Sequence, residues 1–142
     1  ATLTGPEPRG VIVTMGGTVA GWSLYLDNQS RPVFRYRSFE QGEITLQGDE
    51  AVSGDVQLAL NFAYDGGGYA KGGEFTLIVD GKPVEAARIA ATPPSFFSID
   101  ETFDVGVDTG SPAGTYPADS PVGYPLAGAS LRRVNILTAP PR

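Results

Sequence analysis

The sequence predicts an all-β fold, a two-sheet antiparallel β-sandwich formed by one domain of 142 residues. Three observations predict it. Short stretches alternate between apolar and polar residues with a period of two, as strands with one buried face do. Nineteen glycines and twelve prolines supply turns between these stretches. No long segment has the period of an amphipathic helix, and a chain of this length can bury a core of its own.

The clearest strands lie in residues 56–89. Residues 56–64 alternate between apolar and polar or small side chains, and after a glycine-rich loop over 65–73 a second alternating run ends at Val79. Asp80-Gly81 predicts a tight turn, because a type I′ turn requires positive φ at both central residues. Residues 82–89 then return, so the middle of the chain is predicted to be a three-stranded meander.

Five strands are expected before the meander: a short edge strand at 1–4, then strands at 11–13, 22–26, 32–37 and 43–47. In 22–26, Trp22 shares one side with two leucines. In 32–37, Phe34 and Tyr36 form the predicted core face, which leaves Arg35 and Arg37 pointing outward.

The C-terminal third of the sequence is less regular. Residues 95–99 predict a short strand, and residues 131–137 predict the last one, with a bulge at Arg132-Arg133 where the alternation breaks. Between them, residues 100–125 are rich in glycine, proline and aspartate and have no period. A loop of this length is typically functional or packs as an ordered excursion. Residues 138–142 are expected to be a frayed tail.

Composition excludes several classes of function. The net charge of −6 argues against nucleic acid and anionic membranes as partners. The sequence contains no cysteine, which excludes disulfides and zinc–thiolate sites, and no histidine, which excludes a Ser-His-Asp triad and histidine metal sites. The first residue is alanine rather than methionine, which indicates a processed product or a piece of a longer chain. A periplasmic or secreted location is slightly favoured over others.

Six phrases occur together in order: GWSLYL at 21–26, RPVF at 31–34, FAYDGGG at 62–68, KGG at 71–73, VDGK at 79–82 and DVGVDTGSP at 104–112. Their set, which spans roughly residues 10–137, resembles the C-terminal domain of long bacterial arylsulfatases. The resemblance implies a jelly-roll sandwich of the concanavalin A-like, laminin-G-like type, appended to a sulfatase catalytic domain.

The resemblance carries over fold and context rather than chemistry. In that family catalysis uses calcium and a formylglycine made from the first residue of a Cys/Ser-x-Pro-x-Arg motif, and this sequence contains no such motif. We therefore expect a non-catalytic accessory domain that docks on or braces a sulfatase-like partner. The family domain begins with more chain before Ala1, so a first strand is expected to be missing. The open sheet edge would be covered by that partner or by a second copy of the chain.

A calcium site is one candidate. Four carboxylates fall within nine residues, and hard oxygen ligands suit Ca²⁺, although the spacing is not that of an EF-hand. They are Asp100, Glu101, Asp104 and Asp108. The structural alternative is a solvated acidic loop whose side chains cap turns.

Other side chains are candidates for ligand binding. Tyr69, at the tip of the glycine-rich loop, and Trp22 could stack on a sugar, whereas Lys71, Arg35 and Arg37 could meet a sulfate or an acidic partner. The alternatives are a loop whose glycines supply positive φ, a tryptophan that belongs to the core, and ordinary surface charge.

Two further functions stay open. One is a free-standing, lectin-like glycan-binding module, with or without the help of calcium, by analogy with other jelly-roll folds. The other is a stand-alone hydrolase that uses Asp100, Asp104 or Asp108. Glycosidase chemistry requires two carboxylates at a fixed separation, and acids on an irregular loop are weak support for it.

Overall fold

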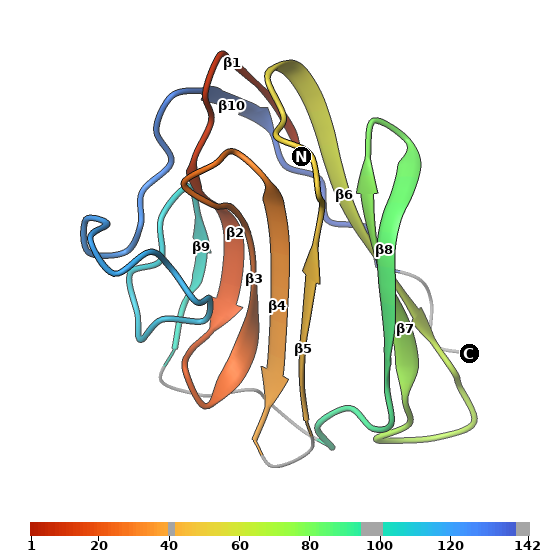
Figure 1. Cartoon of the computed structure of the whole chain (residues 1–142). Helices are drawn as coiled ribbons and strands as arrows, with labels where there is room; N and C mark the ends of the chain where they lie inside the picture. Colours follow the sequence, from red (N-terminus) through yellow and green to blue (C-terminus); the bar gives the residue numbers. More distant parts are fainter. Residues whose placement is uncertain (40–41, 95–100, 139–142) are drawn as a thin grey trace.

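The computed structural model describes residues 1–39, 42–94 and 101–138, and these form an antiparallel two-sheet β-sandwich (Figure 1). One five-stranded sheet, here the β6 sheet, has the order β10-β1-β6-β7-β8. The other, the β3 sheet, has the order β5-β4-β3-β2-β9. The predicted all-β sandwich is therefore confirmed. In the part of the chain that the structure describes, we find no helix with the length and apolar character of a membrane span.

The ten strands of the described residues are β1 (Thr2–Gly5), β2 (Gly10–Gly16), β3 (Ala20–Leu26), β4 (Pro32–Ser38), β5 (Glu43–Gln47), β6 (Gly54–Tyr64), β7 (Gly73–Val79), β8 (Lys82–Ile89), β9 (Phe103–Val105) and β10 (Ser130–Arg133).

The predicted meander is β6-β7-β8. Asp80 and Gly81 have φ angles of 49° and 80°, as the type I′ prediction requires, and they join β7 to β8 where Val79 pairs with Lys82. The Asp80 carboxylate also accepts a hydrogen bond from the backbone N–H of Gln57 at 2.8 Å, so the turn is tied to β6.

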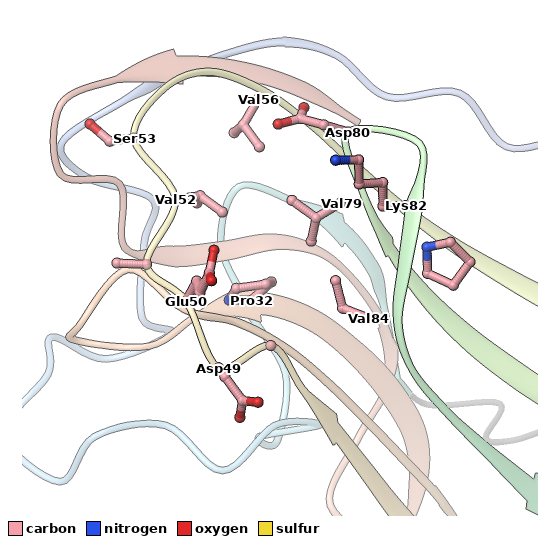
Figure 2. Close-up of a pocket in the computed structure, with 13 residues that line it drawn as sticks. Pro32, Asp49, Glu50, Val52, Ser53, Val56, Val79, Asp80, Lys82 and Val84 are labelled. Carbon is pink, nitrogen blue, oxygen red and sulfur yellow. The ribbon is translucent and has the colours of Figure 1, made fainter.

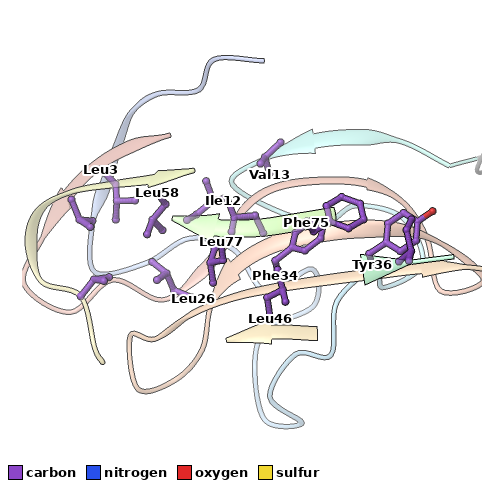
Figure 3. Packing of buried hydrophobic residues seen from close by; sticks show 14 residues of the cluster. Leu3, Ile12, Val13, Leu26, Phe34, Tyr36, Leu46, Leu58, Phe75 and Leu77 are labelled. Atoms are coloured by element: carbon purple, nitrogen blue, oxygen red, sulfur yellow. The ribbon is translucent and has the colours of Figure 1, made fainter. Parts of the chain in front are cut away.

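The core lies between the two sheets (Figure 3). Phe34 and Tyr36 point inward from β4, as predicted, and each ring centroid lies 5.0 Å from that of Phe75 on β7. Leu24 and Leu26 of β3 are buried in the same cluster. Burying one such side chain contributes about 1.5–3 kcal/mol to stability, so this interior holds the two sheets together.

Two predictions about strands were wrong. The N-terminal strand is not an edge strand, because β1 lies between β10 and β6 and its Leu3 is fully buried. The predicted long loop contains β9, which pairs with β2 although its three residues have no readable period. The predicted strand at 95–99 lies outside the described residues.

The last strand, β10, is shorter than predicted. It ends at Arg133 rather than at residue 137. Leu3 pairs with Leu131 and Thr2 pairs with Arg133, so Arg132 is the extra residue of the predicted bulge.

Residues 106–127, here the covering loop, form a third layer. In Figure 1 the loop lies beside β2 and β9, on the side of the β3 sheet that faces away from the β6 sheet. Its Tyr124 packs in a second cluster with Val11, Tyr25 and Val33 from the outer face of that sheet, and Tyr116 lies against them. The covering loop thus buries part of the outer face of the β3 sheet, and it decides what that face can bind.

Candidate functional site

A network of buried polar groups holds the covering loop on the β3 sheet. Asp108 is only 3% exposed, and its Oδ2 accepts hydrogen bonds from the Ala113 N–H at 2.9 Å and the Tyr116 hydroxyl at 2.6 Å. The Tyr116 hydroxyl lies 3.0 Å from the Ser23 hydroxyl of β3. Burial and the hydrogen bond to Asp108 raise the pKa of Tyr116, so its hydroxyl keeps its proton and the ring stays fixed.

Arg35 belongs to the same network, which corrects the prediction that it is an outward, solvent-facing arginine. It points from the outer face of β4, but it is 7% exposed because the covering loop lies over it. Its Nη1 donates to the Ala113 carbonyl at 2.9 Å, and its Nε donates to Glu43 at 2.9 Å. The hydrogen bond from Arg35, with the positive charges of Arg35 and Arg37, lowers the pKa of Glu43. The guanidinium therefore serves the structure and is not presented to an anion.

The candidate calcium ligands bind donors of their own loops. Glu101 accepts hydrogen bonds from the Ser111 hydroxyl and N–H at 2.6 and 3.2 Å, and Asp104 accepts them from Thr102 and Thr109. Burial tends to raise the pKa of Asp104, but these hydrogen bonds outweigh it and lower the pKa. Within residues 1–39, 42–94 and 101–138, no three acidic side chains gather as a metal-binding group.

This arrangement matches the structural alternative, in which acidic side chains cap turns of the loop. Asp100 lies outside the described residues, so the calcium site stays a prediction. Of the acids predicted for hydrolysis, Asp108 is buried and Asp104 is held by its threonine donors, whereas Asp100 lies outside the described residues.

The glycine-rich loop between β6 and β7 presents Tyr69, which is 90% exposed. The Tyr64 hydroxyl donates to the Gly68 carbonyl and accepts a hydrogen bond from the Lys71 N–H at 3.1 Å, so the loop is closed by its own groups. Gly66, like the two glycines after it, has a positive φ, which is the role that the structural alternative gave to these residues.

The predicted ligand-binding residues lie in three different places. Trp22 is on the inner face of β3, with its ring 6.3 Å from Phe34. Arg37, on β4, donates to the Thr18 carbonyl at 3.3 Å and lies 3.8 Å from Glu43. The glycine-rich loop belongs to the other sheet. The structure does not combine these residues into one site.

An apolar row lies on the inner face of the β3 sheet near its β9 edge, and it consists of three exposed side chains, Met15, Phe103 and Val105, and the partly buried Trp22. Met15 pairs across the strands with both Trp22 and Phe103, whose rings are 6.4 Å apart. Met15 is 39% exposed, and Phe103 and Val105 are each 47% exposed.

The row is exposed because the facing sheet is short there. β1 pairs only with the first four residues of β6, and Figure 1 shows β1 and β10 at the upper end of the molecule. The end of β2 and the start of β9, which carry Met15 and Phe103, lie lower in the picture than β1 and β10. The described strands therefore leave these inward-pointing side chains partly uncovered.

Two hollows also lie on the surface of the described residues. A pocket of about 500 Å³ opens between the β5–β6 connection and the β7–β8 hairpin (Figure 2). Val52, Val56 and Val79 form its apolar base, and Glu50 and Lys82 stand near its rim. An apolar group would fit there, but the pocket contains no pair of catalytic groups with a common target.

The second hollow is a groove of about 420 Å³ between the covering loop and the outer face of β5 and β3. Tyr116 and Pro117 form its wall, and Asn28, Thr45 and Gln47 line it. Sequence reasoning missed this groove. The alternation in 43–47 puts Thr45 and Gln47 on one face, but no pattern in the sequence places the aromatic wall opposite them.

No protein-family model matches the chain, and no match was found among the curated proteins or the solved structures compared with it.

Proposed function

We propose that this chain is a non-catalytic accessory domain that docks on a catalytic partner of the arylsulfatase class. The observation that carries the proposal is the apolar row, in which Met15, Phe103 and Val105 are exposed beside the partly buried Trp22. Four adjacent large apolar side chains on one surface are typical of a protein-binding site, whereas single exposed apolar residues are ordinary.

The row has the character of an interface centre. Stable interfaces bury about 800 Å² per partner, and a few aromatic and apolar anchors near the middle supply most of the affinity. Trp22 and Phe103 are held edge to face at an interplanar angle of 71°, so they lose little conformational freedom on binding. The partner surface that fits them is apolar and covers the β9 edge of the sandwich.

The proposal is tested with an arylsulfatase catalytic domain from which its own C-terminal domain has been removed. We expect sedimentation velocity to detect a complex with the wild-type chain. We expect the Phe103→Ser/Val105→Ser double variant to bind at least about tenfold more weakly, a loss of about 1.4 kcal/mol. Alone, the chain should not hydrolyse p-nitrophenyl sulfate.

A matched control is Val122→Ser, because Val122 is fully exposed and lies in the covering loop, away from the row. This variant should bind as the wild type does. Two results would overturn the proposal: independent sedimentation of the wild-type chain and the catalytic domain, or hydrolysis of the aryl sulfate by the chain alone.

A further inference from the structure

The groove beside the covering loop has walls that are fixed before any ligand arrives. The Tyr116 ring stacks on Tyr124 at 5.4 Å and meets Tyr25 edge to face at 5.1 Å, and its hydroxyl is held by Asp108. The Tyr25 hydroxyl donates to the Thr115 carbonyl at 3.1 Å, which fixes the loop beside the groove. A ligand would therefore meet a rigid aromatic surface, which lowers the entropy lost on binding.

The opposite side of the groove is polar and also ordered. Asp27 accepts hydrogen bonds from the backbone N–H groups of Gln29 and Arg31 through Oδ1. Its Oδ2 accepts hydrogen bonds from the Arg31 Nε at 2.9 Å and the Gln47 Nε2 at 3.0 Å. The amide of Gln47 is thereby held in place, with its carbonyl oxygen left for another donor.

The remaining polar groups of the lining are uncharged. Asn28, Thr45 and Thr115 are exposed in the groove, and their side chains make no hydrogen bond within the described residues. Together with the Gln47 carbonyl oxygen, they offer both donors and acceptors next to Tyr116 and Pro117. A ligand that satisfies them has several neutral hydroxyl groups and an apolar face.

We infer that this groove binds a neutral saccharide. A pyranose ring presents C–H groups on one face and hydroxyl groups around its rim, and both halves of the groove have a matching surface. None of the nine lining residues is basic, and the charge of Asp27 is balanced by its ion pair with Arg31, so the groove offers no excess positive charge to a sulfate or a uronate. The groove uses other residues than the docking row, so the inference goes beyond the proposed docking function.

The test is a ¹⁵N-NMR titration of the full chain with neutral tetrasaccharides (cello-, malto-, laminari- and xylotetraose) at up to about 10 mM, since shallow groove sites of this kind bind weakly. We expect at least one of them to shift the amide signals of residues 28, 45, 47 and 115–117. A sulfated analogue of the same sugar should bind less well.

Thr45→Trp fills the groove from an exposed position of β5 and should weaken binding at least about tenfold, a loss of about 1.4 kcal/mol. The matched control is Tyr69→Ala, which removes the most exposed aromatic side chain from the other sheet and should leave the affinity unchanged. A circular dichroism spectrum confirms that both variants fold.

Three outcomes would overturn the inference: no shift with any neutral sugar, shifts centred on the Tyr69 loop, or stronger binding of the sulfated sugar. The docking proposal fails separately. Thr45→Trp should leave the complex with the catalytic domain intact, and Phe103→Ser should leave saccharide binding intact.

Discussion

The covering loop, which forms the third layer of the molecule, depends on the side chain of Asp108. This side chain is buried and accepts two hydrogen bonds from groups of the covering loop, the Ala113 N–H and the Tyr116 hydroxyl. Asp108→Ala would leave the Ala113 N–H buried without a partner and the Tyr116 hydroxyl with Ser23 alone, and we expect it to reduce the free energy of unfolding by about 2–4 kcal/mol. Urea denaturation measures this loss.

The control is Asp119→Ala in the same loop, since Asp119 is exposed and its side chain makes no hydrogen bond within the described residues. It should change stability by no more than about 0.5 kcal/mol. Equal stability of the two variants would show that Asp108 does not hold the covering loop.

The Arg35–Glu43 pair makes stability depend on pH. The hydrogen bond from Arg35 lowers the pKa of Glu43 from its ordinary value of 4.5. The pair therefore contributes to the free energy of unfolding above pH 4.5. This contribution disappears as the pH falls through the lowered pKa that Glu43 has in the folded state. Because Glu43 is half exposed, we expect Glu43→Gln to cost less than about 1 kcal/mol at pH 7.

The measurement is the difference in free energy of unfolding between the wild type and Glu43→Gln from pH 7 down to pH 3. The difference should shrink on the acid side, and at pH 7 it should shrink in about 1 M NaCl because salt screens exposed pairs. A difference that grows in acid would contradict the assignment.

Arg35 also shows what a sequence pattern omits at this scale. Alternation in 32–37 correctly put Phe34 and Tyr36 on the core face and both arginines on the other. A period of two tells which side chains share a face, but not what covers that face. The cover comes from a segment almost eighty residues away in the sequence, with no period of its own.

At the scale of elements, the Asp80-Gly81 turn is the most predictable part of the chain. Both residues have positive φ. At such a position the backbone is strained unless the residue is glycine or has a short polar side chain. We expect Gly81→Ala to cost about 1–2 kcal/mol in the free energy of unfolding, measured by thermal or urea denaturation.

Asp80→Asn is the matched control for this turn. Asparagine tolerates the same φ and keeps the oxygen that accepts the hydrogen bond from the Gln57 N–H. It should stay within about 0.5 kcal/mol of the wild type. A neutral Gly81→Ala variant would show that the hairpin can form with another turn.

The strands that were predicted well pair with strands adjacent in sequence, whereas those that were not predicted well pair with strands remote in sequence. The β6-β7-β8 meander is built from strands adjacent in sequence, so turn chemistry and alternation suffice to predict it. β9 consists of only three residues and becomes a strand because β2 offers a ladder for it. The groove at Thr45 and Tyr116 was likewise invisible, because its two sides come from segments that only the tertiary fold brings together.

At the scale of the whole molecule, β1 joins parts of the chain that are remote in sequence. It pairs on one side with β6 and on the other with β10. Residues near positions 3, 56 and 131 therefore lie side by side on three neighbouring strands. Such pairings cost loop-closure entropy before they are formed, and the sequence carries no local signal for them. This is why β1 was expected at an edge, although it lies inside the sheet.

An internal β1 makes the N-terminal residues indispensable. Without residues 1–5, β10 would lose the one strand it pairs with in the described residues, and the β6 sheet would end at β6. The core would also lose Leu3, so we expect the shortened chain to show no cooperative unfolding transition by circular dichroism.

A milder variant, Leu3→Ala, should fold but lose about 2–5 kcal/mol. Val122→Ala, at a fully exposed position, should lose no more than about 0.5 kcal/mol. If Leu3→Ala were as mild as Val122→Ala, or the shortened chain unfolded as the wild type does, β1 would be a dispensable edge strand after all.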